Sequence, residues 1–264
     1  MKNPRLQWVL AVVLTLASAY WQRVSGPTYP VTGGVRLDGQ EIGLRLTRSH
    51  GGPTDQPVRI EVPDTGVRGE VKWRRYPTAD EWQTLSLARR GTALEAALPN
   101  QPAAGKLEYQ VRLQRGEASA VFPERPAVTR FKGAVSAIVL VPHILAMFAA
   151  MLFSSKALFA GLAGTETRHA VNWTFWLIVV GGFVLGPAVQ RQAFNEWWAG
   201  VPYGWDLTDN KTLIAGVAWL WAWWRTRGRR ADRLSVLAAA VVTLGVFAIP
   251  HSTWGSQIDW AATR

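Results

Sequence analysis

The uneven distribution of apolar residues along this chain constrains its fold more than any other feature of the sequence. Residues 24–132 are polar and rich in Arg, Gly and Pro, whereas residues 134–250 are largely apolar. One globular core would draw its apolar residues from the whole chain. A segregation of this kind therefore indicates a soluble domain joined to membrane segments.

Apolar segments of about 20 residues are long enough to cross a hydrocarbon core about 30 Å thick. The segment closest to the N-terminus also resembles a signal peptide, because it follows Lys2 and Arg5 and contains Ala17-Ser18-Ala19 as a cleavage site. Of the two interpretations we expect a retained signal anchor. Together the candidates predict a membrane α-helical bundle of about five spans. They are Leu6–Trp21, Ala134–Ser154, Ala170–Val189, Thr212–Trp224 and Leu234–Ile249.

Positive residues gather in the loops on one side of this bundle, and cytoplasmic loops carry an excess of Lys and Arg. We therefore expect a bacterial inner-membrane protein with a cytoplasmic N-terminus, and with its polar domain and C-terminus in the periplasm. The residues on the cytoplasmic side are Lys2, Arg5, Lys156, Arg168, Arg225, Arg227, Arg229, Arg230 and Arg233.

The polar region shows short alternating runs separated by Gly, Pro and Asn, a pattern typical of a two-sheet sandwich. The stretch from Leu98 to Tyr109 resembles the turn and tyrosine corner of immunoglobulin-like and fibronectin-III-like domains, with Trp73 as the apolar plug of an earlier strand. The predicted strands are Gly34–Leu37, Ile42–Thr47, Val58–Val62, Glu70–Arg74, Gln83–Ala88, Ala93–Leu98, Lys106–Gln114 and Ala127–Arg130.

These boundaries predict three parts. Residues 1–23 form the N-terminal transmembrane anchor, and residues 24–132 form an all-β, Ig-like or fibronectin-III-like periplasmic sandwich. Residues 133–264 form a four-helix transmembrane domain with an outer interfacial loop at 190–211.

The composition excludes several functions. The chain has no Cys, so it forms no disulfide and no Cys-ligated metal centre. Ionisable residues are nearly absent from the apolar segments, which disfavours a transporter or pump. The net charge is +11, but the densest basic run, from Arg225 to Arg233, lies between two apolar segments and most simply fixes topology, so we expect no nucleic-acid partner. No nucleophile elbow or phosphate-binding loop is present, and we expect no enzymatic activity.

His143, after Pro142, is the one exception to the lack of ionisable residues. It is a candidate cofactor ligand, for a metal, a haem or a chlorin pigment. The alternative, which we favour, is a histidine hydrogen-bonded to a neighbouring helix.

The loop before the fourth segment contains a second candidate site. Asp206 and Asp209, with His251 at the outer end of the fifth segment, are candidate ligands for a divalent metal. The alternative is structural, with Asp209 or Asn210 capping the fourth helix. A catalytic set from Ser252 or Ser256 with His251 and Asp259 is disfavoured by the lack of a nucleophile elbow.

The chain has 15 Trp, many of them near the ends of apolar segments. Such residues suit contacts with lipid, with pigments or with other membrane subunits. The candidates for partner binding are Trp197, Trp198, Trp205, Trp219 and Trp223.

Over most of its length the chain resembles a family of uncharacterised bacterial membrane proteins. The resemblance is carried by the tract from Gly204 to Thr212, by Pro142-His143, by Pro250-His251-Ser252 and by the turn from Gln101 to Lys106. More loosely, it is similar to accessory subunits of photosynthetic reaction-centre–antenna complexes. No established activity comes with that family, so no catalytic residue carries over from it. The lack of catalytic motifs and of an ion path favours a non-catalytic accessory subunit that bridges partners in a large membrane complex, one that we expect to be energy-transducing. The alternative is a metal-binding protein or metal-dependent enzyme.

Overall fold

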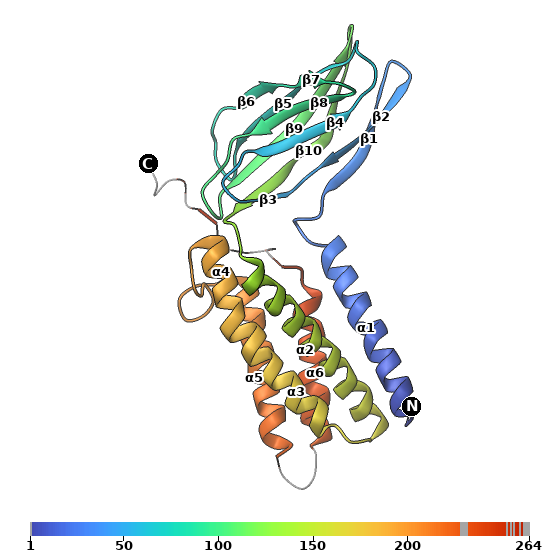
Figure 1. Cartoon of the computed structure of the whole chain (residues 1–264), viewed down its shortest axis with the longest axis vertical. Helices are drawn as coiled ribbons and strands as arrows, with labels where there is room; N and C mark the ends of the chain where they lie inside the picture. The colour runs from blue at the N-terminus through green and yellow to red at the C-terminus, as the bar shows by residue number, and fades with distance from the viewer. Residues whose placement is uncertain are drawn as a thin grey trace. The chain divides into compact units, whose positions relative to one another are not determined.

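The computed structural model describes residues 2–227, 232–251, 253, 255, 257, 258 and 260. The chain divides into two compact units. The helical unit comprises Met1–Pro27 and Val135–Ser256, and the β unit comprises Thr28–Ala134 and Gln257–Arg264. Both are drawn in Figure 1.

Helices account for most of the helical unit. The three elements α3, η1 and α4 run without a break and form one helix, Arg168–Phe194. The elements are α1 (Pro4–Val24), α2 (Ala137–Ala163), α3 (Arg168–Ile178), the π-helix η1 (Val179–Leu185), α4 (Gly186–Phe194), α5 (Leu207–Arg225) and α6 (Arg233–Ala248).

Local sequence explains where several helices begin and end. Asn3 accepts a hydrogen bond from the Arg5 amide at 2.9 Å and is followed by Pro4, the residue best suited to the first helical position. Asp232 caps α6 in the same way, through the amide of Leu234. Helix α2 ends at Gly164, whose positive φ of 67° closes the last turn.

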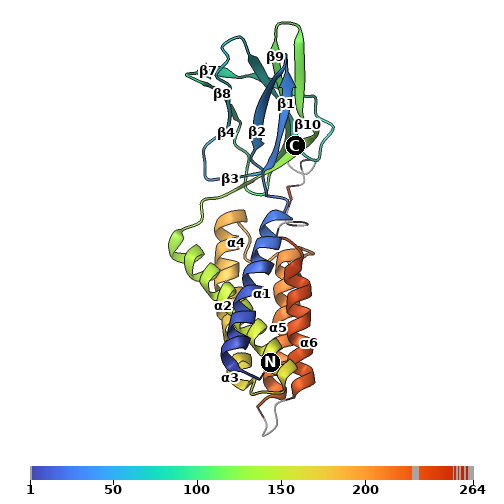
Figure 2. The same cartoon turned by 90° about the vertical axis from the view of Figure 1, so that its right-hand side faces the viewer.

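Small and polar side chains form the contact between α1 and α2, which lie side by side in Figures 1 and 2. Gln7, Ala11 and Thr15 are buried, and their spacing of four residues places them on one face of α1. Thr15 donates to the Ser155 hydroxyl at 3.4 Å. Helix α2 continues to Ala163, beyond the predicted end at Ser154, and Ser155 lies buried in this contact.

The described part of the β unit forms three sheets around one core. Strand order is β3-β10-β9-β5-β6 in the largest sheet, β4-β8-β7 in the second and β1-β2 in the third. The strands are β1 (Val31–Leu37), β2 (Gln40–Leu46), β3 (Ser49–Gly51), β4 (Gln56–Glu61), β5 (Arg68–Arg75), β6 (Gln83–Ser86), β7 (Ala88–Arg90), β8 (Ala93–Leu98), β9 (Lys106–Arg115) and β10 (Ala118–Lys132).

Apolar and polar residues alternate along the strands of this unit, and the apolar ones face its core. Strand β2 buries Ile42, Leu44 and Leu46 and exposes the residues between them. Its hairpin with β1 closes through Asp38 and Gly39, both with positive φ, which is the usual backbone of an Asp-Gly turn. Neighbouring strands in the large sheet are antiparallel, apart from the parallel pair β10 and β3.

Two of the residues expected to mark an Ig-like domain lie in this core. Trp73 is almost fully buried and Tyr109 is fully buried. The Tyr109 hydroxyl donates to Thr47, in the segment that follows β2, instead of to a residue a few positions upstream in its own turn. The expected tyrosine corner is therefore absent, because the hydroxyl ties β9 to a distant segment.

The prediction of about five membrane spans is wrong. Among the described residues, two helices are long and apolar enough to cross a membrane: Ala137–Ala163 and Arg168–Phe194. Helix α6 is apolar but has only 16 residues. Helix α1 is interrupted by Gln7, Thr15 and Gln22, and α5 begins with the polar run Thr208–Thr212, so neither has a sufficiently apolar stretch.

Candidate functional site

The polar residues singled out in the sequence gather around the first turn of α5. Asp206 is the N-cap of this helix, and its Oδ1 accepts from the amides of Thr208 at 2.8 Å and Asp209 at 3.4 Å. Because the first amides of a helix have no partner inside it, a carboxylate at this position stabilises the helix start. The capping role expected of Asp209 or Asn210 thus belongs to Asp206.

Asp209 holds the preceding loop in place. Its Oδ2 accepts three hydrogen bonds, from the Ala199 amide at 2.6 Å, the Gly200 amide at 3.1 Å and Gln190 Nε2 at 3.0 Å. Burial raises the pKa of the Asp209 carboxyl, and the hydrogen bonds from Ala199 and Gln190 oppose this shift by favouring the charged form.

The neighbouring Asn210 continues the same pattern, because its Oδ1 accepts from the Val201 amide at 2.8 Å. Three successive loop amides therefore point at the first turn of α5. The approach requires glycine at position 200, since a Cβ there would lie 2.7 Å from Asp209 Cβ and 2.8 Å from Asn210 Oδ1. The loop is held close to the helix along this edge.

Lys211 ties α5 to the end of α6. Its side chain is 1% exposed, and Nζ donates to the carbonyl of Ile249 at 2.6 Å and lies 3.4 Å from His251 Nδ1. The last carbonyls of a helix lack intrahelical partners and carry partial negative charge, so a buried ammonium is favourable there. Burial lowers the pKa of Lys211 to about 8.

His143 lies against the π-helical turn. Its Nδ1 is 2.9 Å from the carbonyl oxygen of Gly181, which also accepts from the Gly186 amide. The histidine is therefore hydrogen-bonded to a neighbouring helix, the alternative favoured from the sequence. A histidine that binds a metal donates its other ring nitrogen in the same manner. The role of His143 as a cofactor ligand stays a prediction.

The three predicted metal ligands have structural partners. Asp206 and Asp209 accept backbone amides, and His251 lies beside Lys211. Within the described ranges, no group of three or more His, Asp or Glu side chains is placed to hold a metal ion. The disfavoured catalytic set cannot be located, because Ser252, Ser256 and Asp259 lie outside the described residues.

The five tryptophans predicted to bind partners fall into two groups. Trp197 and Trp205 are exposed. Trp198 stacks on Phe183 with ring centroids 5.9 Å apart, and Trp223 stacks on Phe175 at 4.5 Å. Trp219 is fully buried and donates to Thr243 at 2.7 Å, so it packs inside the helical unit.

Sequence reasoning missed two residues of this site. Lys211 lies in the predicted outer loop at 190–211, directly before the apolar segment Thr212–Trp224, and a Lys at that position is itself a signal. Gln190 was placed at the edge of the outer loop, but it lies in α4 and contacts Asp209. Comparisons with protein-family models, curated proteins and solved structures find no match to the chain.

Proposed function

We propose that this protein is a non-catalytic accessory subunit of a bacterial membrane complex, which inserts through its helical unit and carries the β unit outside the membrane. The observation that supports it best is the distribution of side chains in the helical unit. Many polar and small side chains lie between the helices, together with a few large apolar ones such as Phe175, Ile178 and Trp219, and many large apolar side chains lie outside.

The interior contains many hydroxyl groups. In lipid, helices associate through small residues and interhelical hydrogen bonds, because apolar side chains gain nothing by leaving the acyl chains. Buried polar residues of the helical unit are Gln7, Thr15, Ser154, Ser155, Thr167, Thr174, Asp209, Lys211, Thr212, Thr226, Ser235 and Thr243.

The exterior of the two apolar helices shows the opposite composition. On α2, Leu145 is 64% exposed and Ile138 is 84% exposed. In water, exposing side chains of this size on one helix face would be costly, at roughly 25 cal/mol for each Å² of apolar surface. A membrane or the apolar helices of partner subunits remove this cost.

Lys and Arg gather at one end of the helical unit, whereas at the other end Arg23, Arg191 and Lys211 lie with Asp206 and Asp209. At one end Lys156 donates to Gln7, and Arg168 donates to the Arg227 carbonyl. Arg5, Arg225 and Arg233 lie in the same terminal turns. Lys and Arg of this kind favour the cytoplasmic side, which supports a cytoplasmic position for this end of the helical unit.

The accessory role is supported by what the polar side chains do. Asp206, Asp209 and Lys211 each stabilise a helix end or a loop, so the most polar cluster of the helical unit has a structural explanation. We infer that the outward apolar faces bind lipid and other membrane subunits. A pigment-bearing partner complex is the specific form that the resemblance implies.

Membrane fractionation tests the insertion. The tagged chain is expected to stay in the membrane pellet during an alkaline carbonate wash. Leu145→Lys places a charge on the outer face of α2, at an insertion cost of about 3 kcal/mol, and should lower the resistant fraction. The control is Val121→Lys, a similarly exposed apolar residue of the β unit, which should change nothing. Release of the unmodified chain by carbonate would contradict membrane insertion.

Purification tests the accessory role. After mild detergent extraction of native membranes, size exclusion and mass spectrometry should find the chain with other membrane subunits in fixed proportion. An absorption spectrum of that fraction tests for pigments. A stable particle that contains this chain alone would contradict the role, whatever the carbonate wash shows.

A further inference from the structure

The loop between α4 and α5, residues 195–206, exposes three large aromatic side chains. Trp197 is 61% exposed, Tyr203 is 83% exposed and Trp205 is 85% exposed. Trp and Tyr combine an apolar ring with a polar hydrogen-bonding group, a pairing that suits the boundary between acyl chains and water. We call residues 195–206 the aromatic loop.

The aromatic loop is folded on itself. The Tyr203 and Gly204 amides both donate to the Gly200 carbonyl, at 2.9 and 3.0 Å, and the Asp206 amide donates to the Ala199 carbonyl at 2.9 Å. A Cβ at position 204 would lie 2.5 Å from the Ala199 carbonyl oxygen, so the turn is tight.

The helical unit holds the aromatic loop from the inside. Asp209 and Asn210 accept the amides of Ala199, Gly200 and Val201. Trp198, unlike its exposed neighbours, stacks on Phe183 and donates to the Val201 carbonyl at 3.1 Å. The loop that carries the outward aromatic residues is thus already folded. Their insertion into an apolar environment therefore costs little conformational entropy.

The position of the loop in the chain indicates what it contacts. Helix Arg168–Phe194 is one of the two helices apolar enough to cross a membrane, and the loop begins at the next residue, Asn195. Where such a helix leaves the acyl region, the following residues lie at the headgroup level. Arg191, in the last turn, donates to the Asn195 carbonyl and side chain, which fixes this junction.

We infer that the aromatic loop is a preformed lipid anchor, in which Trp197, Tyr203 and Trp205 insert at the headgroup–acyl boundary of the membrane leaflet where Arg168–Phe194 ends. This inference rests on the proposed insertion of the helical unit. It adds a defined contact that fixes the depth and tilt of the unit in the bilayer.

Site-directed fluorescence tests the anchor, and the chain has no Cys to interfere with labelling. Single-cysteine variants Tyr203→Cys and Trp205→Cys are labelled with an environment-sensitive dye, and the full chain is placed in phosphatidylcholine vesicles. Quenchers are iodide in water, a nitroxide lipid labelled near the headgroup and a nitroxide lipid labelled deep in the acyl chain. Leu145→Cys and Val121→Cys report the acyl region and the aqueous β unit.

Both loop labels are expected to be quenched on the order of twofold more by the shallow nitroxide than by the deep one, as for residues of an aromatic belt. Position 145 should show the reverse order, and position 121 should respond to iodide alone. Iodide quenching of the loop labels equal to that at 121, while 145 keeps its response to the deep nitroxide, would overturn the anchor alone. Loss of lipid quenching at 145 as well would overturn membrane insertion.

A protein partner is the remaining alternative for this surface. Loop labels that iodide reaches in vesicles of the pure chain, but not in native membranes, would identify a partner and overturn the lipid anchor.

The preformed structure of the aromatic loop is tested separately by Asp209→Ala and Gly200→Ala in the Tyr203→Cys background. Each should reduce the preference for the shallow nitroxide, and unchanged quenching in both would contradict it.

Discussion

The Tyr109 hydroxyl donates to the Thr47 carbonyl at 2.7 Å and joins β9 to the segment that follows β2. Gln56 Nε2 lies 3.4 Å from the same hydroxyl and also donates to Thr47 Oγ1 at 3.0 Å. The Thr47 carbonyl also accepts from Gln56 Nε2 at 3.3 Å, so the fully buried tyrosine and Gln56 share this acceptor.

Tyr109→Phe should lower the free energy of unfolding of the β unit by about 0.5–1.5 kcal/mol, because it removes one buried hydrogen bond while Gln56 still donates to the Thr47 carbonyl. Urea unfolding of the full chain in detergent, followed by circular dichroism, measures the loss. Tyr20→Phe, at an exposed position of α1, is the control. A loss as large in the control would show that the buried bond is not the cause.

The same tyrosine predicts an alkaline limit of stability. Burial raises the pKa of Tyr109 well above its usual value of 10. Below pH 10 the phenol is neutral in both states and its contribution to stability is complete. At higher pH the unfolded chain releases the proton and the folded chain keeps it, so stability falls as pH rises. The fall should be shallower in Tyr109→Phe, and identical slopes would contradict the shift.

Local rules predicted the β unit well, because alternation and turn residues are local signals. Each predicted strand overlaps an observed one, although Gln83–Ala88 is divided between β6 and β7. Contacts between distant residues were not predictable. Nothing near Lys211 in the sequence indicates that its partner is Ile249, and nothing near Tyr109 indicates Thr47.

The helical unit was predicted less well, since hydropathy describes composition and not packing. Gln7 and Thr15 lower the hydropathy of α1 below that of a membrane span. Both side chains are buried, and Thr15 is hydrogen-bonded to Ser155 of α2. Of the site, the first-turn aspartates were found from their residue type. Their division into a helix cap, Asp206, and a loop acceptor, Asp209, required the backbone of residues 195–206.

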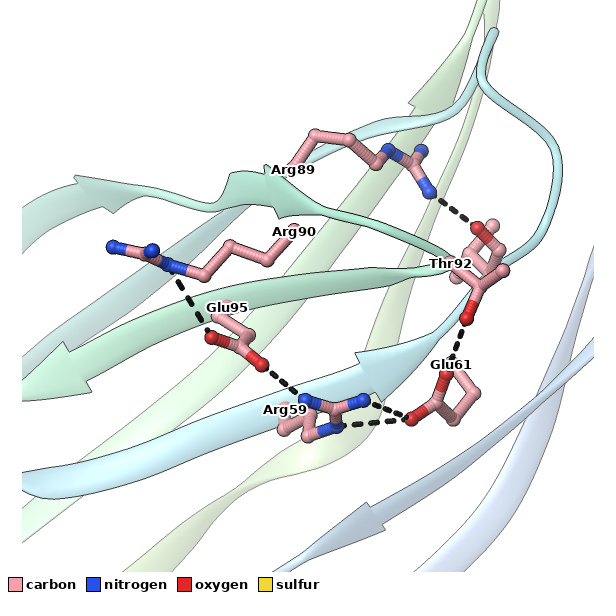
Figure 3. Close-up of polar contacts among 7 residues, drawn as sticks. Arg59, Glu61, Arg89, Arg90, Thr92 and Glu95 are labelled. Atoms are coloured by element: carbon pink, nitrogen blue, oxygen red, sulfur yellow. Dashed lines mark hydrogen bonds and ion pairs between the residues drawn. The ribbon is translucent and has the colours of Figure 1, made fainter.

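A polar network on β4, β7 and β8 allows two neighbouring arginines to be compared (Figure 3). Arg89 is half-buried and donates to the carbonyls of Val62, Asp64 and Val67. Arg90 is exposed and lies 3.5 Å from Glu95. The first holds a turn together, whereas the second forms one ion pair in water.

Arg89→Met should therefore destabilise the β unit by about 1–3 kcal/mol and speed proteolysis near Val62–Val67, since three acceptors lose a shared donor. Arg90→Met should cost about 0.2–1 kcal/mol at most, the usual range for an exposed pair. Limited proteolysis with urea unfolding measures both. Equal effects would mean that the Arg89 contacts do not hold the turn.

Two glycines in neighbouring helices form a matched pair for testing packing. A Cβ at Gly216 in α5 would lie 2.4 Å from the Phe183 ring, whereas a Cβ at Gly245 in α6 meets nothing within 4 Å. Phe183 also stacks on Trp198, so its ring has little room to move.

Gly216→Ala should lower the stability of the helical unit by about 1–3 kcal/mol through overpacking. Gly245→Ala should raise it by up to about 1 kcal/mol, because Ala favours helix more than Gly does. Thermal unfolding in detergent, followed by circular dichroism, compares them. A Gly216→Ala protein as stable as Gly245→Ala would show that the Phe183 ring is free to turn away.

The indole of Trp219 and the hydroxyl of Thr243 test the polar interior directly. Trp219 Nε1 donates to Thr243 Oγ1 at 2.7 Å, and Thr243 donates in turn to the Ala239 carbonyl at 2.8 Å.

Thr243→Val keeps the shape of the side chain and removes the acceptor, so the fully buried N–H of Trp219 is left unpaired at a cost of about 1–3 kcal/mol. Thr243→Ser keeps the acceptor and should cost less. A double-mutant cycle with Trp219→Phe, measured by thermal unfolding in detergent, isolates the pair, because Thr243→Val should cost little once the indole N–H is gone. Additive losses in the cycle would contradict the coupling and the proposal that interhelical hydrogen bonds hold this unit together.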